Sequence, residues 1–396
     1  MKGFLLTLAL LAVPVLAVEP QDTINTRPVM SDYTGKDCQH GACDKFVAYP
    51  RVKAAVVKIT MTNATPVPSP PPAAPASVAS TGLIAAIASN FDTSSELVPT
   101  WGSGAIPSSA APDVVGAFRF ICTAGQSSSD DPIVYPGKTG ASHRHRFFGN
   151  TLTSANSTYA TLRATGDSTC MSKLNRSGYW QPEMLDGKGA AVVPDYWAIY
   201  YKRYPASSPL CKVQGSECVA IPPGLKFIFG YDMVTNTPPT GSMFWQCTGN
   251  NGNTVLNPSS KTMGAALNKC PVGYELEVRI EAPDCWDGVN LDSANHRDHV
   301  AYAAYNNGQL RCDTRHQKVM PQFTLGAFWK VTADAGNWVL SSDAMAGTAP
   351  GDSFHSDFFS AWDPTTEATW TANCIDKLLN CSGGDLGNGK QLRQAR

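Results

Sequence analysis

Short runs that are rich in apolar and aromatic residues recur from residue 116 onward, and clusters of Gly, Pro, Asn and Asp separate them. Such runs are typical of β-strands, and the Gly, Pro, Asn and Asp clusters are typical of turns. The pattern predicts strands at residues 116–122, 196–201, 225–229, 274–280 and 322–332.

Helical spacing of apolar residues is much rarer. Residues 154–164 and 367–379 are the best candidates for helices, and a short helix is also expected at 83–89. Regular helical crossovers between the predicted strands are absent, which disfavours an α/β fold. We therefore predict a mainly β fold, a β-sandwich-like domain with long disulfide-stapled loops and few short helices.

Composition divides the chain into parts. A basic start, a short apolar run and a small residue at position 17 are typical of a secretory signal peptide, and the run is too short to cross a bilayer as a helix. The segment rich in Pro, Ala and Ser favours an extended spacer. We expect a signal peptide at 1–17, a small N-terminal segment at 18–64 with one alternating run, a linker at 65–112, a main domain at 113–382 and a C-terminal tail at 383–396.

The 12 cysteines all follow the predicted signal peptide. An even number of cysteines in an exported chain indicates disulfides, and the absence of CxxC pairs disfavours a cysteine-rich zinc module. Cys38 with Cys43, Cys211 with Cys218 and Cys374 with Cys381 are expected to close local loops, and the remaining pairing stays open. The expected location is secreted or extracellular, with the periplasm and the cell surface both open, and no membrane span is expected.

The numbers of basic and acidic side chains are nearly equal. With 31 basic and 32 acidic side chains, the formal net charge is −1. Such a balance gives no reason to expect electrostatic binding to nucleic acid or to acidic membranes. The sequence also lacks the GxSxG, P-loop and HExxH motifs of familiar enzyme classes.

Histidines gather in the second part of the chain, where six of the seven occur. An imidazole binds transition metals and moves protons near neutral pH. His143 and His145 share one face if their segment is extended, so both rings are able to converge on one ion. The alternative for an isolated pair is an edge strand in which one ring bonds to the backbone. His296 and His299 lie on one side of a helical turn, if one forms.

A carboxylate accompanies the last histidine. Asp357 follows His355 by two residues among several aromatic residues, and is expected to orient that ring. A simple surface pair is the alternative. The candidate catalytic residues are His143, His145, His296, His299, His355 and Asp357. The candidate metal ligands are His143, His145 and His299, and the expected cofactor is a divalent ion, copper or zinc.

Aromatic residues mixed with Arg, Lys and Asp occur at 176–182 and 194–203. Flat rings beside hydrogen-bond donors suit a carbohydrate groove, although ordinary amphipathic strands have the same composition. The candidate substrate-binding residues are Arg176, Tyr179, Trp180, Tyr200, Lys202 and Trp286. Arg163 and Lys202 are candidates for neutralising a uronate.

An ordered set of motifs resembles the family known as domain of unknown function 1996. The motifs lie at 131–137, 142–145, 147–150, 179–182, 194–196, 200–203, 222–224, 283–288, 291–299 and 353–358, within a stretch of roughly 118–374. The resemblance implies a secreted protein of a fungal and bacterial group whose members are sometimes joined to sugar-binding modules. It therefore implies work on extracellular glycans.

Three functions follow as hypotheses. The first is a secreted protein that acts on extracellular polysaccharide or cell-wall glycan, a lyase or hydrolase with a histidine-rich site. The second is a secreted copper- or zinc-binding protein. The third is a non-catalytic glycan-binding protein in which aromatic residues bind and histidines only brace loops.

Overall fold

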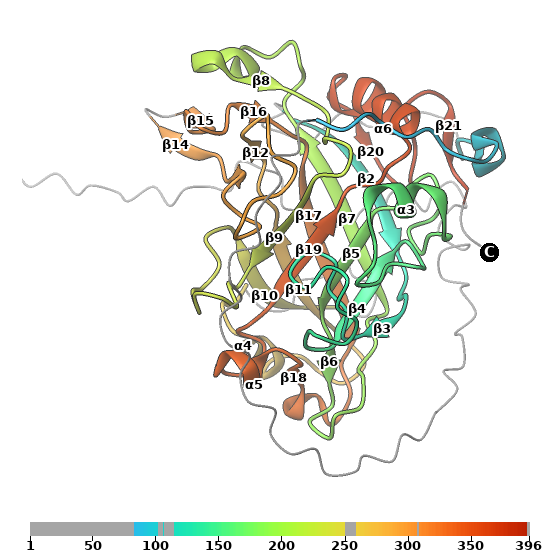
Figure 1. Cartoon of the computed structure of the whole chain (residues 1–396). Coiled ribbons are helices and arrows are strands. Elements are labelled where there is room, and N and C mark those ends of the chain that lie inside the picture. The colour runs from blue at the N-terminus through green and yellow to red at the C-terminus, as the bar shows by residue number, and fades with distance from the viewer. Residues whose placement is uncertain (1–82, 102–105, 107–114, 250–258, 307–308, 394–396) are drawn as a thin grey trace, which may run out of the picture.

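Two large β-sheets form the centre of the described chain, which comprises residues 83–101, 106, 115–249, 259–306 and 309–393 of a computed structural model (Figure 1). The six-stranded sheet has the order β10 (Met243–Thr248), β11 (Glu275–Glu281), β17 (Gln322–Lys330), β7 (Tyr196–Arg203), β2 (Gly116–Cys122) and β20 (Asn380–Cys381). The five-stranded sheet has the order β3 (Ser127–Ser128), β4 (His145–Gly149), β5 (Gly178–Pro182), β19 (His355–Phe359) and β9 (Lys226–Gly230).

Smaller elements surround these two sheets. The helices are η2 (Thr93–Glu96), α3 (Tyr159–Ala164), η3 (Pro209–Gly215), α4 (Met263–Leu267), η4 (Ala335–Asn337), α5 (Asp343–Ala346), α6 (Pro364–Trp370) and the π-helical η5 (Thr371–Ile375). The short strands are β1 (Leu97–Pro99), β6 (Met184–Leu185), β8 (Glu217–Cys218), β12 (Cys285–Trp286), β13 (Val300–Ala301), β14 (Ala304–Asn306), β15 (Gln309–Arg311), β16 (Lys318–Val319), β18 (Val339–Leu340) and β21 (Lys390–Leu392). Figure 1 shows α6 and β21 near one end of the sheets and α4, α5 and β18 near the other.

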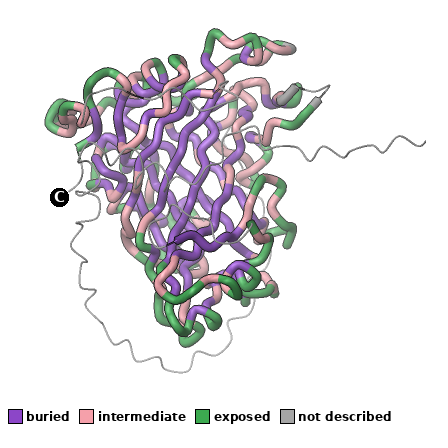
Figure 2. The backbone as a smooth tube through the Cα atoms, turned by 180° about the vertical axis from the view of Figure 1, so that it is seen from behind, coloured by how far each residue is buried: buried purple, intermediate pink, exposed green. Residues whose placement is uncertain are grey.

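The core lies between the facing sides of the two sheets. Alternate residues of each strand point inward, as the period-two pattern requires. Phe323 of β17 meets Phe358 of β19, with ring centroids 5.0 Å apart, and also meets Tyr179 of β5 at 6.2 Å. Figure 2 shows the strands buried along much of their length and the connecting loops exposed. The predicted mainly β, sandwich-like fold is therefore confirmed.

The predicted strands agree closely with the observed ones. Strand β2 has the predicted bounds, and β7, β9, β11 and β17 differ from theirs by at most two residues at either end. Helices α3 and α6 lie within or next to the segments with helical spacing. The helix expected at 83–89 does not form. The amide of Ile87 donates to the Tyr159 hydroxyl at 3.1 Å and its carbonyl accepts from Arg163 at 3.0 Å, so side chains of α3 satisfy this backbone.

Regular structure extends past both predicted edges of the main domain. Strand β1, from the predicted linker, pairs antiparallel with β21, from the predicted tail. Leu392 of β21 is buried in the main core cluster. The pairing satisfies the backbone groups of both segments and adds them to the folded unit. The predicted signal peptide, the segment 18–64 and the Cys38–Cys43 pair lie outside the described residues.

Five disulfides connect the described cysteines, and none of these cysteines is free. The bonds are Cys122–Cys170, Cys211–Cys218, Cys247–Cys270, Cys285–Cys312 and Cys374–Cys381. The two local loops expected at Cys211–Cys218 and Cys374–Cys381 are confirmed. Among the described residues, no helix is both long and apolar enough to span a membrane.

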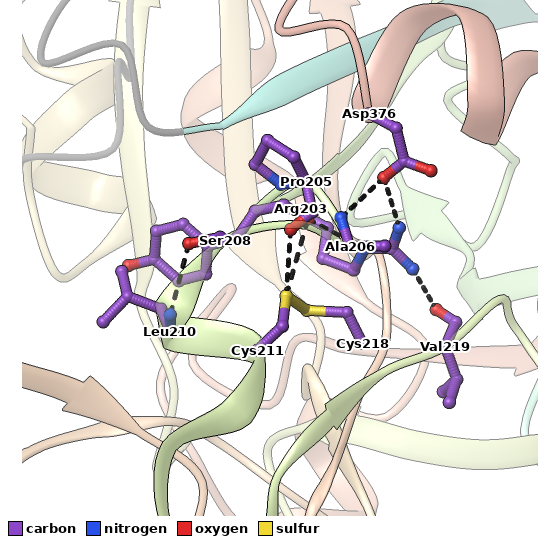
Figure 3. Close-up of a disulfide and its surroundings, with 10 residues drawn as sticks. Arg203, Pro205, Ala206, Ser208, Leu210, Cys211, Cys218, Val219 and Asp376 are labelled. Carbon is purple, nitrogen blue, oxygen red and sulfur yellow. Dashed lines mark hydrogen bonds and ion pairs between the residues drawn. A yellow bond between two sulfur atoms is a disulfide. The ribbon is translucent and has the colours of Figure 1, made fainter.

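Figure 3 shows how one local disulfide is attached to the six-stranded sheet. Arg203, at the end of β7, donates to the carbonyl of Val219, the residue after Cys218. The same guanidinium donates to Asp376 at 2.9 Å, and Asp376 also accepts from the amide of Ala206 at 2.8 Å. These contacts fix both ends of the loop to the edge of the core.

The buried carboxyl of Glu367 in α6 has a raised pKa, which makes the stability of the fold depend on pH. Burial raises the pKa of its carboxyl from 4.5 to about 8, although the Ile221 amide that donates to it and nearby Arg203 act in the opposite direction. Because the folded state retains the proton, its stability falls as the pH rises from 4.5 towards 8. Glu367→Gln keeps an acceptor for Ile221 but has no charge to bury. We expect equal stability at pH 4 and a gain of several kcal/mol, on the order of 4, at pH 9.

Urea unfolding of both proteins at the two pH values checks this expectation. A stability difference that does not change with pH would mean that the Glu367 carboxyl ionises normally.

Candidate metal centre

The outer face of the five-stranded sheet carries an unusual set of polar side chains. Along β19, His355, Asp357 and Phe359 project from one face, whereas Phe358 projects into the core. Along β4, His145 and Phe147 share the corresponding face. Both histidine-bearing strands flank β5, so their side chains lie on the same side of one sheet.

A loop covers this outer face. Residues 129–144 run from β3 to β4, and Asp130 holds the loop closed by accepting from the amides of Gly140 at 2.9 Å and Ala155 at 3.3 Å. Ile133 is buried in a separate apolar cluster with Phe147, Trp180 and Tyr159 of α3. The loop and α3 therefore form a lid over the sheet, and His143 lies in the last part of the loop.

Three histidines converge beneath this loop. The ring centroids of His143 and His145 are 4.2 Å apart, those of His143 and His355 are 5.1 Å apart, and those of His145 and His355 are 6.1 Å apart. One ring nitrogen from each lies within 4.8 Å of the other two. We call this group the histidine triad. It joins the end of the covering loop and the adjacent strand β4 to β19, which lies far along the sequence.

Main-chain carbonyls fix how two of the rings are protonated. Nδ1 of His145 lies 3.0 Å from the carbonyl oxygen of Asp130, and Nδ1 of His355 lies 2.8 Å from that of Ser353. A carbonyl oxygen only accepts, so each Nδ1 carries the hydrogen and each Nε2 has a free lone pair. Among the described residues, Nε2 of His143 and of His145 is buried without a partner. Metal-binding histidines are held in this way.

The surroundings keep all three rings neutral. Burial, followed by the charges of His145 and His355, lowers the pKa of His143 well below 6.5. Burial, followed by His145, lowers the pKa of His355 to about 3. Burial also lowers the pKa of His145, although the nearby Asp131 carboxylate raises it in part. Neutral rings keep their lone pairs available for a metal ion.

Two local features hold His355 in place. Asp343 accepts from the Ser353 hydroxyl at 2.6 Å and from the amide of Gly351 at 2.9 Å, which fixes the segment whose carbonyl orients the ring. Gly230 of β9 is opposite His355 and has a φ of +93°. A Cβ at this position would lie 2.7 Å from the His355 Cα, so β9 is able to approach β19 only because residue 230 is glycine.

The other predicted histidines do not join the triad. His299 uses both ring nitrogens, bonding to the Ser293 hydroxyl and to the Lys226 carbonyl, each at 2.9 Å. His296, which has a positive φ, bonds to Asp292 at 2.8 Å, and Asp292 in turn pairs with Lys226 at 3.1 Å. These contacts attach the loop 291–299 to β9. The sequence prediction named His299 as the third metal ligand, but His355 is the third member of the histidine triad.

Asp357 does not orient His355, because the Ser353 carbonyl has that position. Side chains two residues apart on a strand point to the same face and are about 6.6 Å apart along the strand. Because both side chains stand roughly perpendicular to the sheet, this distance is too long for a direct hydrogen bond between Asp357 and His355. Both carboxyl oxygens of Asp357 are buried and have no hydrogen-bond partner among the described residues. Burial, followed by the charge of Asp131, raises its pKa well above 3.8, and Arg297 acts in the opposite direction.

The six residues expected to bind a substrate are buried. Tyr179 lies between the sheets and shares a hydrogen bond of 2.8 Å with Tyr201, while Trp180 stacks on Phe147 beneath the loop. Trp286 donates to the carbonyl of Asn290. Sugar stacking requires an exposed ring face, and these rings are 0–4% exposed.

The cationic candidates are buried as well. Arg176 donates to the carbonyl of Arg163 at 2.8 Å, and Arg163 itself is fully buried and pairs with Asp363 at 3.3 Å. Tyr200 lies on the outer side of the six-stranded sheet, with the Arg119 guanidinium 4.4 Å and the Lys202 ammonium 5.6 Å from its ring centroid. Arg163 and Arg176 therefore connect segments of the fold.

Comparison with known protein families gives one match, and its range includes the whole histidine triad. Residues 131–362 match the family model described as Domain of unknown function (DUF1996). The chain belongs to this family. The DUF1996 match includes most of the covering loop and all of β4, β5, β9 and β19. No curated protein and no solved structure matches the chain.

Proposed function

We propose that this DUF1996 protein is an extracellular metalloprotein whose histidine triad binds one zinc or copper ion. The observation that carries the proposal is the convergence of three neutral imidazoles, with one ring nitrogen of each within 4.8 Å of the others. Nitrogens around a tetrahedral zinc ion at 2.0–2.1 Å are roughly 3.4 Å apart. Each pair of ring nitrogens therefore has to approach by at most about 1.4 Å for coordination. Imidazole suits both zinc and copper.

Ligation fits the triad better than proton transfer does. A general base works best when its pKa is close to the operating pH. With a pKa of about 3, His355 is a weak base at neutral pH, and His143 is also shifted well down. Depressed pKa values do not impair metal binding, because protons then compete poorly for the ligand nitrogens.

We further propose that the protein is secreted and that its substrate class is extracellular polysaccharide. Five disulfides support an oxidising compartment, and the sequence resemblance supports a glycan. Hydrolysis is the reaction that suits a three-histidine centre, because a metal ion activates water. Non-catalytic glycan binding is the alternative. A panel of polysaccharides incubated with metal-loaded and chelated protein distinguishes the two: product release should depend on the metal, whereas binding alone yields no product.

Elemental analysis tests the metal proposal itself. Purified protein loaded with zinc or copper and then dialysed should retain one ion per chain. A protein that retains neither ion after loading would show that the triad is not a metal centre.

A further inference from the structure

Polar atoms without partners surround the histidine triad. Ser128 of β3 is directly opposite His145, and Trp180 of β5 is directly opposite Asp357. Directly paired residues of antiparallel strands project from the same face, so all four side chains share the outer face of the sheet. The Ser128 hydroxyl, the Trp180 indole N–H and both Asp357 oxygens are buried without hydrogen-bond partners among the described residues.

Such a concentration indicates a bound polar ligand. Buried polar groups in folded proteins are nearly always hydrogen-bonded, and each one left without a partner costs about 1–3 kcal/mol. Ser128 lies on β3, three strands away from β19 and about 14 Å across the sheet, so it is too far from Asp357 to share one ligand. The directly opposed pair of Trp180 and Asp357 contains a donor, the indole N–H, and acceptors, the carboxyl oxygens. It is therefore complementary to a small ligand that both donates and accepts hydrogen bonds.

The position of Asp357 identifies where that ligand binds. Asp357 is not part of the group of ligand atoms within 4.8 Å, which contains only the three histidines. It lies two residues beyond His355, about 6.6 Å further along the strand. A metal–oxygen distance of about 2 Å followed by a hydrogen bond of about 2.7 Å spans most of this separation.

We propose that Asp357 accepts a hydrogen bond from the metal's non-protein ligand, a water molecule or hydroxide, and that the Trp180 indole N–H donates a hydrogen bond to the same ligand. This inference rests on the proposed metal centre. It makes the fourth coordination position exchangeable, as in catalytic rather than structural zinc sites. Asp357 is then a positioning residue for metal-assisted hydrolysis.

Asp357→Asn tests this role, because it keeps the shape of the side chain and removes the carboxylate. We expect cobalt(II) or zinc to bind about 10- to 100-fold more weakly, as is typical when a group that supports a metal ligand is lost. The visible spectrum of the cobalt(II) protein should also change. The metal-free variant should melt at the same temperature as the parent or higher, because it no longer buries an unpaired carboxyl. A residue with only a structural role would lower the melting temperature instead.

Two further variants complete the experiment. Glu367→Gln also exchanges a buried carboxyl for an amide, but away from the triad, and should leave cobalt affinity and spectrum unchanged. Trp180→Phe keeps an aromatic ring against Phe147 while removing the N–H, and should change the cobalt spectrum even if Asp357→Asn does not fold. Parent-like cobalt affinity and spectrum in both site variants would overturn the inference. Failure of the parent protein to bind any metal would instead overturn the proposed function.

Discussion

Replacing His145 by alanine is expected to weaken zinc or copper binding by about 10³-fold. The ring provides one of three protein ligands, and zinc sites with apparent binding free energies of about 10–16 kcal/mol gain roughly 4 kcal/mol from each ligand. His143→Ala and His355→Ala should have losses of the same size, because all three nitrogens converge on one point. Competition with a chromophoric chelator measures each dissociation constant.

His299→Ala is the matched control. His299 is as buried as His145, but its two nitrogens bond to Ser293 and Lys226. Its loss should leave metal affinity within about 3-fold of the parent while lowering stability by about 2 kcal/mol, since the loop 291–299 loses an attachment to β9. Unchanged metal affinity in His145→Ala, or an equal loss in His299→Ala, would contradict the assignment of the triad.

The second large effect concerns the disulfide Cys122–Cys170. Cys122 ends β2 of the six-stranded sheet, and Cys170 lies in the connection that leads to β5 of the other sheet. Its sequence separation is 48 residues, for which loop-closure entropy predicts about 4 kcal/mol of stabilisation. The double variant Cys122→Ala/Cys170→Ala should therefore lose about that much unfolding free energy in urea.

The peripheral disulfide Cys211–Cys218 provides the comparison. It closes a separation of only 7 residues, so its removal as a double alanine variant should cost about 2 kcal/mol. A smaller loss for Cys122–Cys170 than for Cys211–Cys218 would mean that the long-range bond does not constrain the unfolded chain.

The fold could be predicted because local patterns determine strands. Residues 116–122 form a short apolar and aromatic run whose predicted bounds match β2, and the long run at 322–332 gave β17 within two residues. The helix expected at 83–89 was wrong because tertiary contacts to Arg163 and Tyr159 decide the conformation of this segment. The spacing of apolar residues along the sequence does not reveal such tertiary contacts.

The site was predictable only in part. The spacing of His143 and His145 indicated a convergent pair, and the structure places them together. That His355 rather than His299 completes the group depends on the neighbouring positions of β4, β5 and β19, which no local motif encodes. The carbonyls of Asp130 and Ser353 orient the rings, and backbone groups have no sequence signature. The burial of Tyr179 and Trp180 likewise follows from the stacking of whole sheets.

X-ray absorption at the metal edge of the zinc- or copper-loaded protein tests the central claim most directly. We expect three imidazole nitrogens at about 2.0–2.1 Å from the metal and one further light-atom ligand from a non-protein group. A metal bound with fewer than three imidazoles, or the same spectrum in the triple variant His143→Ala/His145→Ala/His355→Ala, would contradict this claim.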